Sequence, residues 1–154
     1  MTTNESVDGL LATLDKTVHE VLAYFEGPGS TSKARVGDWG AWEILCHFVF
    51  WHGATSEGME SVARGGAPYR LDAGVDELND RIIAKHQGES FNQLTARLRE
   101  LQVRLGQAAR SLPDLDAPVI LRFDGSTWSG RERLEIINRH WARHVAELQT
   151  AEPS

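Results

Sequence analysis

The sequence has little cysteine, little proline and no excess of positive charge. Its one cysteine, Cys46, excludes a disulfide within the chain and a cysteine-rich zinc module, and this usage fits a reducing cytoplasm. Five prolines and 14 glycines in 154 residues exclude fibrous and disordered chains. With 16 basic and 22 acidic residues the net charge is −6, which argues against nucleic acids and acidic membrane surfaces as partners.

Long hydrophobic runs are also missing. The most apolar stretch, residues 41–54, is shorter than the ~20 residues that a membrane span needs, and Glu43, His47 and His52 interrupt it. The first residues, MTTNESVDG, contain no basic signal region, and the last four, AEPS, contain no anchor. We therefore expect a cytoplasmic protein without a membrane partner, folded as a single domain over residues 1–154.

Apolar residues recur every three or four positions, which is typical of amphipathic α-helices. This spacing predicts helices over about residues 6–25, 40–63, 75–87, 91–112 and 130–149. Asp38 and Ser90 are expected N-caps of the second and fourth segments, and the third and fourth can be one kinked helix or two. Four principal helices and almost no strand signal predict an all-α fold, a four-helix bundle.

The connections between these helices differ in character. Residues 65–74 are too polar and irregular to form an element, and their number predicts a long crossover between the second and third helices. Residues 119–128 can form a short hairpin around Asp124-Gly125. The core is expected to contain the following residues: Leu14, Leu45, Val49, Leu98, Leu101, Ile137 and Trp141.

The chemistry must come from the six histidines, because the sequence has no Ser/His/Asp, P-loop, GxGxxG or CxxC pattern at a useful spacing. His140 and His144 are four residues apart, so on a helix they share a face, at the spacing by which two imidazoles share a metal. Both are expected to point toward the bundle interior. His47 lies in an apolar segment, where a buried imidazole needs partners for both nitrogens. A metal with one hydrogen bond meets this need, and so do two ordinary hydrogen bonds.

The other histidines and the charged residues have simpler expected roles. His52 lies about 140° around the helix from His47, which predicts a surface or rim position. His19 and His86 are expected to be solvated, and Cys46 is expected to be a small buried hydrophobe. The arginines of the last helix alternate with glutamates, which predicts an exposed, salt-bridged face: Arg131, Arg133, Arg139 and Arg143.

Three features of the sequence resemble a known family. The segment WGAWEILCHFVFW, which runs from Trp39 through His47 to Trp51, resembles the second-helix signature of the DinB/YfiT-like superfamily. The segment IINRHWARH, which ends at His144, resembles the closing motif of the DfsB/ClbS-like branch, and Asn79 adds a third match. The resemblance covers about residues 10–148. It implies an up-down-down-up bundle in which the second helix gives one metal ligand and the last helix gives two.

Carried over to this sequence, the resemblance implies a metal site made by His47, His140 and His144. His140 stands where some relatives have a carboxylate. Three neutral imidazoles suit zinc, nickel is the next expectation, and cobalt or iron(II) can also occupy such a site.

Further residues are expected around this site. Glu43 and Glu147 can orient the metal-binding histidines without themselves binding the metal, or they can be solvated charges on their helices. The resemblance places Asn79, Trp128 and Tyr69 near the mouth of the site, where they can hold a substrate, and core packing is the alternative for Trp128. The second helix is apolar nearly all round, as at Phe48, Phe50 and Trp51, and this predicts a homodimer.

Two classes of function remain open. The first is a metal-dependent enzyme that activates water or a low-molecular-weight thiol for hydrolysis or transfer onto a small electrophilic substrate. The resemblance points to both reactions, because some members of the superfamily are thiol-dependent transferases or isomerases, and the ClbS-like branch hydrolyses or sequesters a reactive metabolite. The second class is a non-catalytic, self-protection type of protein that binds or sequesters a ligand and has a structural or vestigial histidine cluster. This class stays open because, apart from the metal site, the sequence shows no set of residues that would act as general acid and base.

Overall fold

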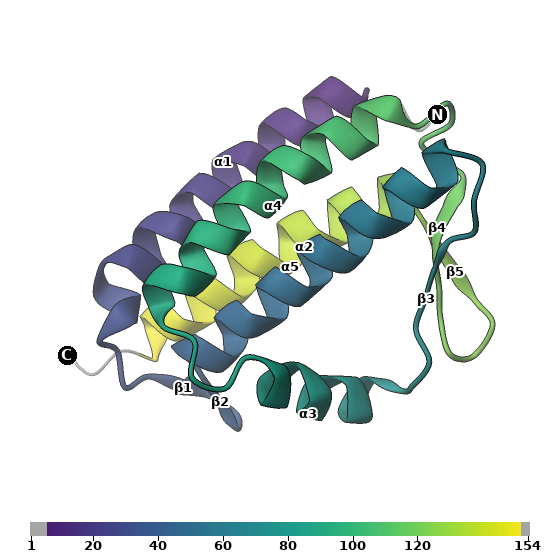
Figure 1. The fold of residues 1–154 in the computed structure, drawn as a ribbon. Helices are drawn as coiled ribbons and strands as arrows, with labels where there is room; N and C mark the ends of the chain where they lie inside the picture. Colours follow the sequence, from purple (N-terminus) through teal and green to yellow (C-terminus); the bar gives the residue numbers. More distant parts are fainter. Residues whose placement is uncertain (1–5, 152–154) are drawn as a thin grey trace.

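The computed structural model describes residues 6–151, and most of these are helical (Figure 1). The helices are α1 (Val7–Glu26), α2 (Ala41–Ala63), α3 (Val75–Lys85), α4 (Phe91–Ser111) and α5 (Gly130–Thr150), with a short 3₁₀ helix at Pro28–Ser30. The strands are β1 (Arg35–Val36), β2 (Trp39–Gly40), β3 (Tyr69–Arg70), β4 (Pro118–Leu121) and β5 (Thr127–Ser129). The chain is thus mostly helical, as predicted, and it also contains two small sheets, which a purely all-α fold lacks.

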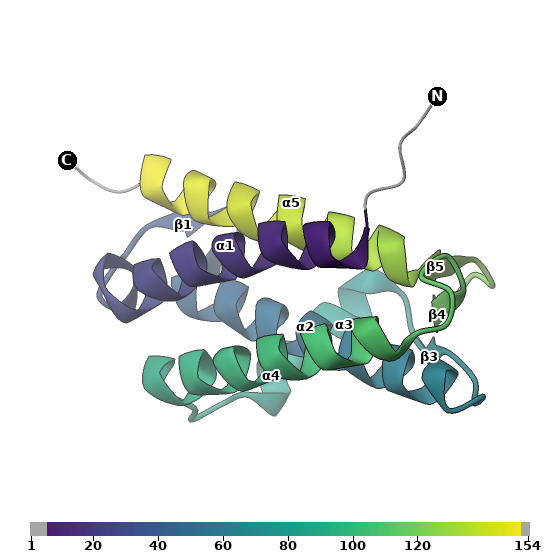
Figure 2. The same cartoon turned by 90° about the horizontal axis from the view of Figure 1, so that it is seen from above.

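The four long helices lie side by side in both views (Figures 1 and 2). α1 and α5 run in one direction along their common axis, and α2 and α4 run in the other. The closest packing is between α2 and α4, between α1 and α5, and between α1 and α4. The short helix α3 packs on α2 outside this group, after a long connection from the end of α2. None of the described helices combines the length and apolarity that a membrane crossing demands.

The start of α4 forms where the sequence predicts it. The Ser90 hydroxyl accepts a hydrogen bond from the Gln93 N–H at 3.1 Å, and the Gln93 side chain accepts one from the Ser90 N–H at 2.8 Å. This reciprocal capping box satisfies two N–H groups that the helix itself leaves unpaired. It also separates α3 from α4, so the third and fourth segments are two helices.

The start of α2 differs from the prediction. Asp38 is not its N-cap, because residues 35–40 form the β1–β2 hairpin, and the helix begins only after Gly40. The Glu43 carboxylate accepts the Gly40 N–H at 2.9 Å and so closes the first turn. Gly37, in the turn of this hairpin, has a φ of 63°. A residue with a side chain adopts this left-handed conformation only at a cost in free energy.

A small three-stranded sheet covers one end of the long helices (Figure 2). The predicted hairpin is present, since β4 and β5 pair antiparallel on either side of Asp124-Gly125. The prediction that residues 65–74 contain no element is wrong, because β3 lies there and pairs parallel with β4, Tyr69 opposite Ile120. A two-residue strand whose partner is about 50 residues away leaves no periodic signal in its own sequence.

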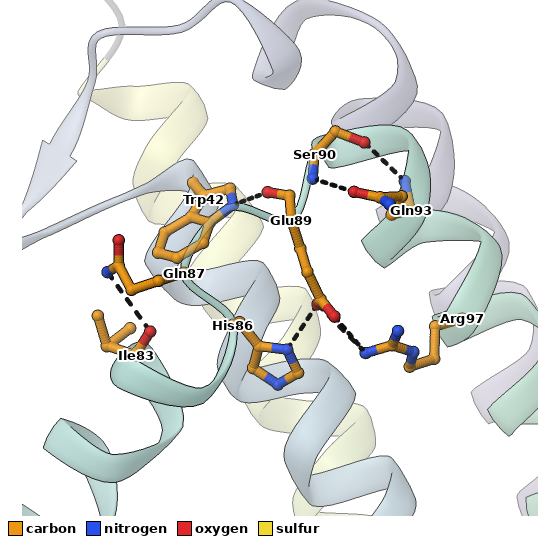
Figure 3. Close-up of polar contacts among 8 residues, drawn as sticks. All are labelled: Trp42, Ile83, His86, Gln87, Glu89, Ser90, Gln93 and Arg97. Atoms are coloured by element: carbon orange, nitrogen blue, oxygen red, sulfur yellow. Dashed lines mark hydrogen bonds and ion pairs between the residues drawn. The ribbon is translucent and has the colours of Figure 1, made fainter.

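The junction between α3 and α4 is fixed by Glu89 (Figure 3). Its carboxylate binds His86 Nδ1 at 2.7 Å and the Arg97 guanidinium at 3.0 Å, and its backbone carbonyl accepts the Trp42 indole N–H at 2.8 Å. The prediction of a solvated His86 is wrong, because the turn folds this ring beneath Glu89, where it is buried. The indole of Trp42 thereby joins α2 to this turn.

The core contains six of the seven residues predicted for it, and Leu101 is only partly buried. His52 also lies in the core, completely buried, so its predicted surface or rim position is wrong. Its Nδ1 accepts the Trp141 indole N–H at 3.0 Å, and its Nε2 donates to the Gln102 side-chain oxygen at 2.8 Å. The Gln102 amide in turn donates to Asp15. α4 and α5 cover α2 on different sides. The face of α2 that carries His52, about 140° around the helix from His47, is therefore buried as well.

Candidate functional site

A cavity of about 320 Å³ opens between α2, α3 and α5. Trp39 from β2 and Trp128 from β5 contribute to its wall. The apolar part of the lining comes mainly from α2 and α5: Ile44, Phe48, Trp51, Ile136, Ile137 and Trp141, with Val75 from α3. Five polar side chains share this lining: His47, Asn79, Arg133, His140 and His144. The structure therefore gathers all three predicted metal ligands around one cavity.

His47 is held rigidly on α2. Its Nδ1 donates to the backbone carbonyl of Glu43 at 2.8 Å, and its ring stacks on that of Trp39 with the centroids 3.8 Å apart. Because a carbonyl only accepts, Nδ1 carries the proton, and in the neutral ring the lone pair is on Nε2. Nε2 lies 2.9 Å from the Asn79 side-chain oxygen, and because a neutral Nε2 only accepts, the contact is a hydrogen bond when the amide is turned so that its NH₂ group takes this place. Burial lowers the pKa of His47, which favours the neutral ring.

Glu43 orients His47, but through its backbone. Its carbonyl accepts the His47 hydrogen bond, and its carboxylate is used at the helix start and lies 3.9 Å from Arg35. The i to i−4 spacing brings this carbonyl to the imidazole, so any residue at position 43 would supply the same acceptor. The predicted orienting role thus does not depend on the glutamate side chain.

His140 and His144 lie on one face of α5, as their spacing predicts. Their rings stack with the centroids 5.9 Å apart and the planes 16° apart. Their predicted inward orientation is met in part: both line the cavity, but His140 is exposed and His144 is half-buried. Burial lowers the pKa of His140, and the neighbouring His144 and Arg133 act in the same direction.

One ring nitrogen in this group has no hydrogen bond. His144 Nδ1 is buried and unbonded, although a carboxylate oxygen of Glu147 lies 3.2 Å away, because that approach is outside hydrogen-bonding geometry. Buried ring nitrogens usually have a partner, so an unbonded one marks a place where a further ligand can bind. Glu147 thus lies beside this ring without a hydrogen bond to it.

The residues fit a divalent metal in donor type and in protonation, but their nitrogens are not yet assembled around one point. Within residues 6–151, no three His, Cys, Asp or Glu side chains stand close enough together to hold a metal ion. His47 Nε2 is directed at Asn79, and of the two α5 rings His140 is exposed and His144 is half-buried. Binding of a metal by the three histidines would require His47 to exchange Asn79 for the metal and the α5 rings to turn.

The two predicted aromatic residues separate in space. Trp128 lines the histidine cavity, whereas Tyr69 on β3 lines hollows beside Phe50 and Lys85. The resemblance placed Tyr69 near the site, but its strand pairs with β4, and Tyr69 lines the other hollows instead.

Arg133 is a cavity residue that sequence reasoning misses. Instead of joining an exposed arginine face, it is buried at the cavity, with its guanidinium beside the rings of Trp51 and Trp128, 5.1 and 4.7 Å from their centroids. The other three arginines do lie at least partly in solvent, and two of them pair with carboxylates: Arg131 with Asp116, and Arg143 with Glu147. The signal that could have found Arg133 is its spacing, seven residues before His140 and therefore on the same helix face.

Comparison with known proteins identifies the family. The model of the DinB superfamily matches residues 28–148. The chain belongs to the DinB superfamily. The matched range of this DinB-superfamily chain includes all three histidines, Asn79 and Arg133. No curated protein matches the sequence.

Solved structures with this superfamily fold share little sequence with the chain. A mycothiol-dependent maleylpyruvate isomerase is 17% identical with a TM-score of 0.75, over 96% of this chain and 63% of that protein. The chain therefore corresponds to less than two thirds of the isomerase. Two uncharacterised proteins match over nearly their whole length. One, from Escherichia coli UTI89, is 13% identical with a TM-score of 0.73 over 97% of this chain and 94% of its own. The other, from Clostridium difficile 630, is 16% identical with a TM-score of 0.72 over 97% and 98%.

Proposed function

We propose that this DinB-superfamily protein is a metal-dependent enzyme acting on a small molecule, with His47, His140 and His144 as the metal ligands. The observation that carries the proposal is the meeting of three imidazoles from α2 and α5 at one cavity, with His144 Nδ1 buried and unbonded. Zinc and nickel are the metals that such a donor set favours. When bound, the metal supplies Lewis acidity that brings the pKa of a water or a thiol toward neutrality.

The protein's own residues prepare this chemistry. The Glu43 carbonyl fixes the tautomer of His47, so that Nε2 faces the cavity with its lone pair, and the stacked Trp39 ring fixes the plane. Asn79 is the hydrogen-bond partner of His47 Nε2 when no metal is bound. Once the metal displaces it, the Asn79 amide is available to bind a substrate. The aromatic walls give the cavity a largely apolar surface, and about 320 Å³ is within the range of small-molecule sites.

The proposed reaction is hydrolysis of, or thiol transfer onto, a small electrophile. A low-molecular-weight thiol is included as a co-substrate because one protein of similar fold is mycothiol-dependent, although that protein is 17% identical and considerably longer. One observation favours a second candidate, a non-catalytic binding protein. His47 already has hydrogen bonds on both ring nitrogens, as a structural histidine would.

Metal analysis of protein purified without a histidine tag tests the proposal. The wild type should hold about one equivalent of metal, and added zinc or nickel should raise its melting temperature by mass action. The His140→Ala, His144→Ala double variant should lose both the metal and the shift, because a single remaining imidazole binds weakly. His19→Ala is the matched control, since His19 is exposed on α1, and it should keep both.

Three outcomes separate the candidates. Stoichiometric metal in the double variant, or a melting temperature that no divalent metal shifts at neutral pH, contradicts the metal site. Loss of metal with unchanged ligand binding favours the non-catalytic protein. Because ligating imidazoles must be deprotonated, metal occupancy should also fall as the pH drops below neutral.

A further inference from the structure

Arg133 is a buried cation without a buried anion beside it. Its side chain has 3% of its surface exposed, and its one hydrogen bond runs from Nε to the Thr55 hydroxyl at 3.2 Å. No aspartate or glutamate of residues 6–151 forms an ion pair with it. Its Nη atoms make no hydrogen bond in that range and are accessible to solvent, since His144 Nδ1 is the one fully buried side-chain nitrogen or oxygen there without a partner. Burial lowers the pKa of Arg133 to about 9, so the side chain is still charged at neutral pH. An unpaired buried charge is costly, and proteins normally supply a partner.

The groups around Arg133 leave the N–H groups in the plane of its guanidinium available for hydrogen bonds. Trp51 and Trp128 lie 5.1 and 4.7 Å from its central carbon, and Arg122 lies 4.4 Å from the Trp128 ring. Aromatic rings stabilise a guanidinium through cation–π contacts but accept no in-plane hydrogen bond. Arg133 also lines the cavity. The missing acceptor therefore has room to arrive from the cavity, as part of a ligand.

We propose that Arg133 binds the carboxylate of the substrate, and that this substrate is a small monocarboxylate with an apolar or aromatic body. This inference rests on the proposed function, since it assigns a substrate class to the same cavity. A guanidinium matches a carboxylate with two parallel hydrogen bonds. The mostly aromatic lining suits an apolar body, and a single buried cation matches a single negative charge better than a phosphate dianion.

The position of Arg133 also sets the direction of the bound molecule. Arg133 precedes His140 by seven residues, two helical turns, so their Cα atoms are about 10 Å apart along α5. A carboxylate held at Arg133 leaves the other end of the molecule facing His140, His144 and His47. Arg133 is thus a binding residue that presents the reactive end of the substrate to the histidines.

Binding of simple carboxylates tests this inference without turnover. The probes are benzoate and hexanoate, each paired with its neutral amide, benzamide and hexanamide. Affinity is measured by calorimetry and by the fluorescence of the cavity tryptophans, on the protein as purified and again after treatment with a chelator. We expect each carboxylate to bind the wild type at least about tenfold more tightly than its amide, before and after chelation, because a charge-assisted pair adds this much.

Variants then assign the effect to Arg133. Arg133→Met should weaken binding of the carboxylates about 10- to 100-fold with little effect on the amides, and Arg133→Lys should restore part of it, since lysine keeps the charge without the fork. Arg139→Met is the matched control, because Arg139 is exposed on the same helix, and it should bind as the wild type does. The wild-type comparison of acid with amide requires no variant to fold.

The inference is overturned if the wild type binds neither carboxylate, if it binds acid and amide equally, or if Arg133→Met keeps the preference. Competition by inorganic phosphate at equal concentration overturns the carboxylate class. A preference that disappears with the metal assigns the anion to the metal and also overturns the inference. Conversely, if the protein binds no metal but keeps an Arg133-dependent preference, the metal proposal fails and the anion site stands.

Discussion

His52 should make the protein sensitive to acid. The ring is completely buried, and burial above all, with the nearby charge of Arg133, lowers its pKa from 6.5 to about 4. Its hydrogen bonds also require the neutral form, because Nδ1 accepts from Trp141 and has no room for a second proton. A folded-state pKa below the unfolded value means that the unfolded chain takes up the proton first. Stability from this ring is therefore complete above pH 6.5 and is lost as the pH falls through about 4.

The size of the effect follows from the distance between the folded and unfolded pKa values of His52. Between pH 7 and pH 4 the ring should remove about 3 kcal/mol from the free energy of unfolding, since each tenfold change in a protonation equilibrium corresponds to about 1.4 kcal/mol. Urea unfolding followed by circular dichroism across this pH range measures the loss. The quantity to compare is the difference between wild type and His52→Gln, which keeps a polar side chain and does not titrate. The variant should be less stable at pH 7 and should lose about 3 kcal/mol less on acidification.

The comparison isolates His52 because other titrating groups are common to both proteins. His19→Gln, the same replacement at an exposed position on α1, should leave the pH dependence of the wild type unchanged. A difference below about 1 kcal/mol between wild type and His52→Gln would show that the ring is not held neutral, and the reasoning from burial would be refuted.

Two further predictions concern packing. Gly58→Ala should lower the melting temperature markedly, because a Cβ there would lie 2.1 Å from the Val119 carbonyl oxygen. Gly53→Ala in the same helix is the control: its Cβ would meet only the side chain of Leu101, at 3.9 Å, so this variant should be neutral or stabilising by up to ~1 kcal/mol. A Gly58→Ala protein that melts with the wild type would contradict the close contact between α2 and β4. Leu98→Ala should cost about 2 to 5 kcal/mol in urea unfolding, because Leu98 is fully buried, and a cost typical of a surface position would contradict its place in the core.

Local sequence patterns are sufficient to predict the helices and the helix face that two histidines share. Helix period and capping are local properties, so the apolar stripes and Ser90 predict α4 within a residue or two, and α1 and α5 equally well. The spacing of His140 and His144 is local as well, and it predicts the shared face on which their rings lie stacked. The resemblance at Trp39 and His47 extended this to a site spanning two helices, and the structure brings all three histidines to one cavity.

Which polar residues are buried, and which groups they face, depends on how the helices pack against one another. A helical wheel shows which face of one helix is apolar, but it does not show which neighbours cover the remaining faces. His52 was predicted to be exposed for this reason, yet α4 and α5 cover it with Gln102 and Trp141. Arg133 alternates with glutamates in sequence, but Trp51 and Trp128, distant in the chain, enclose it. The strand β3 likewise depends on β4, about 50 residues away, because pairing between distant segments is a property of the folded chain.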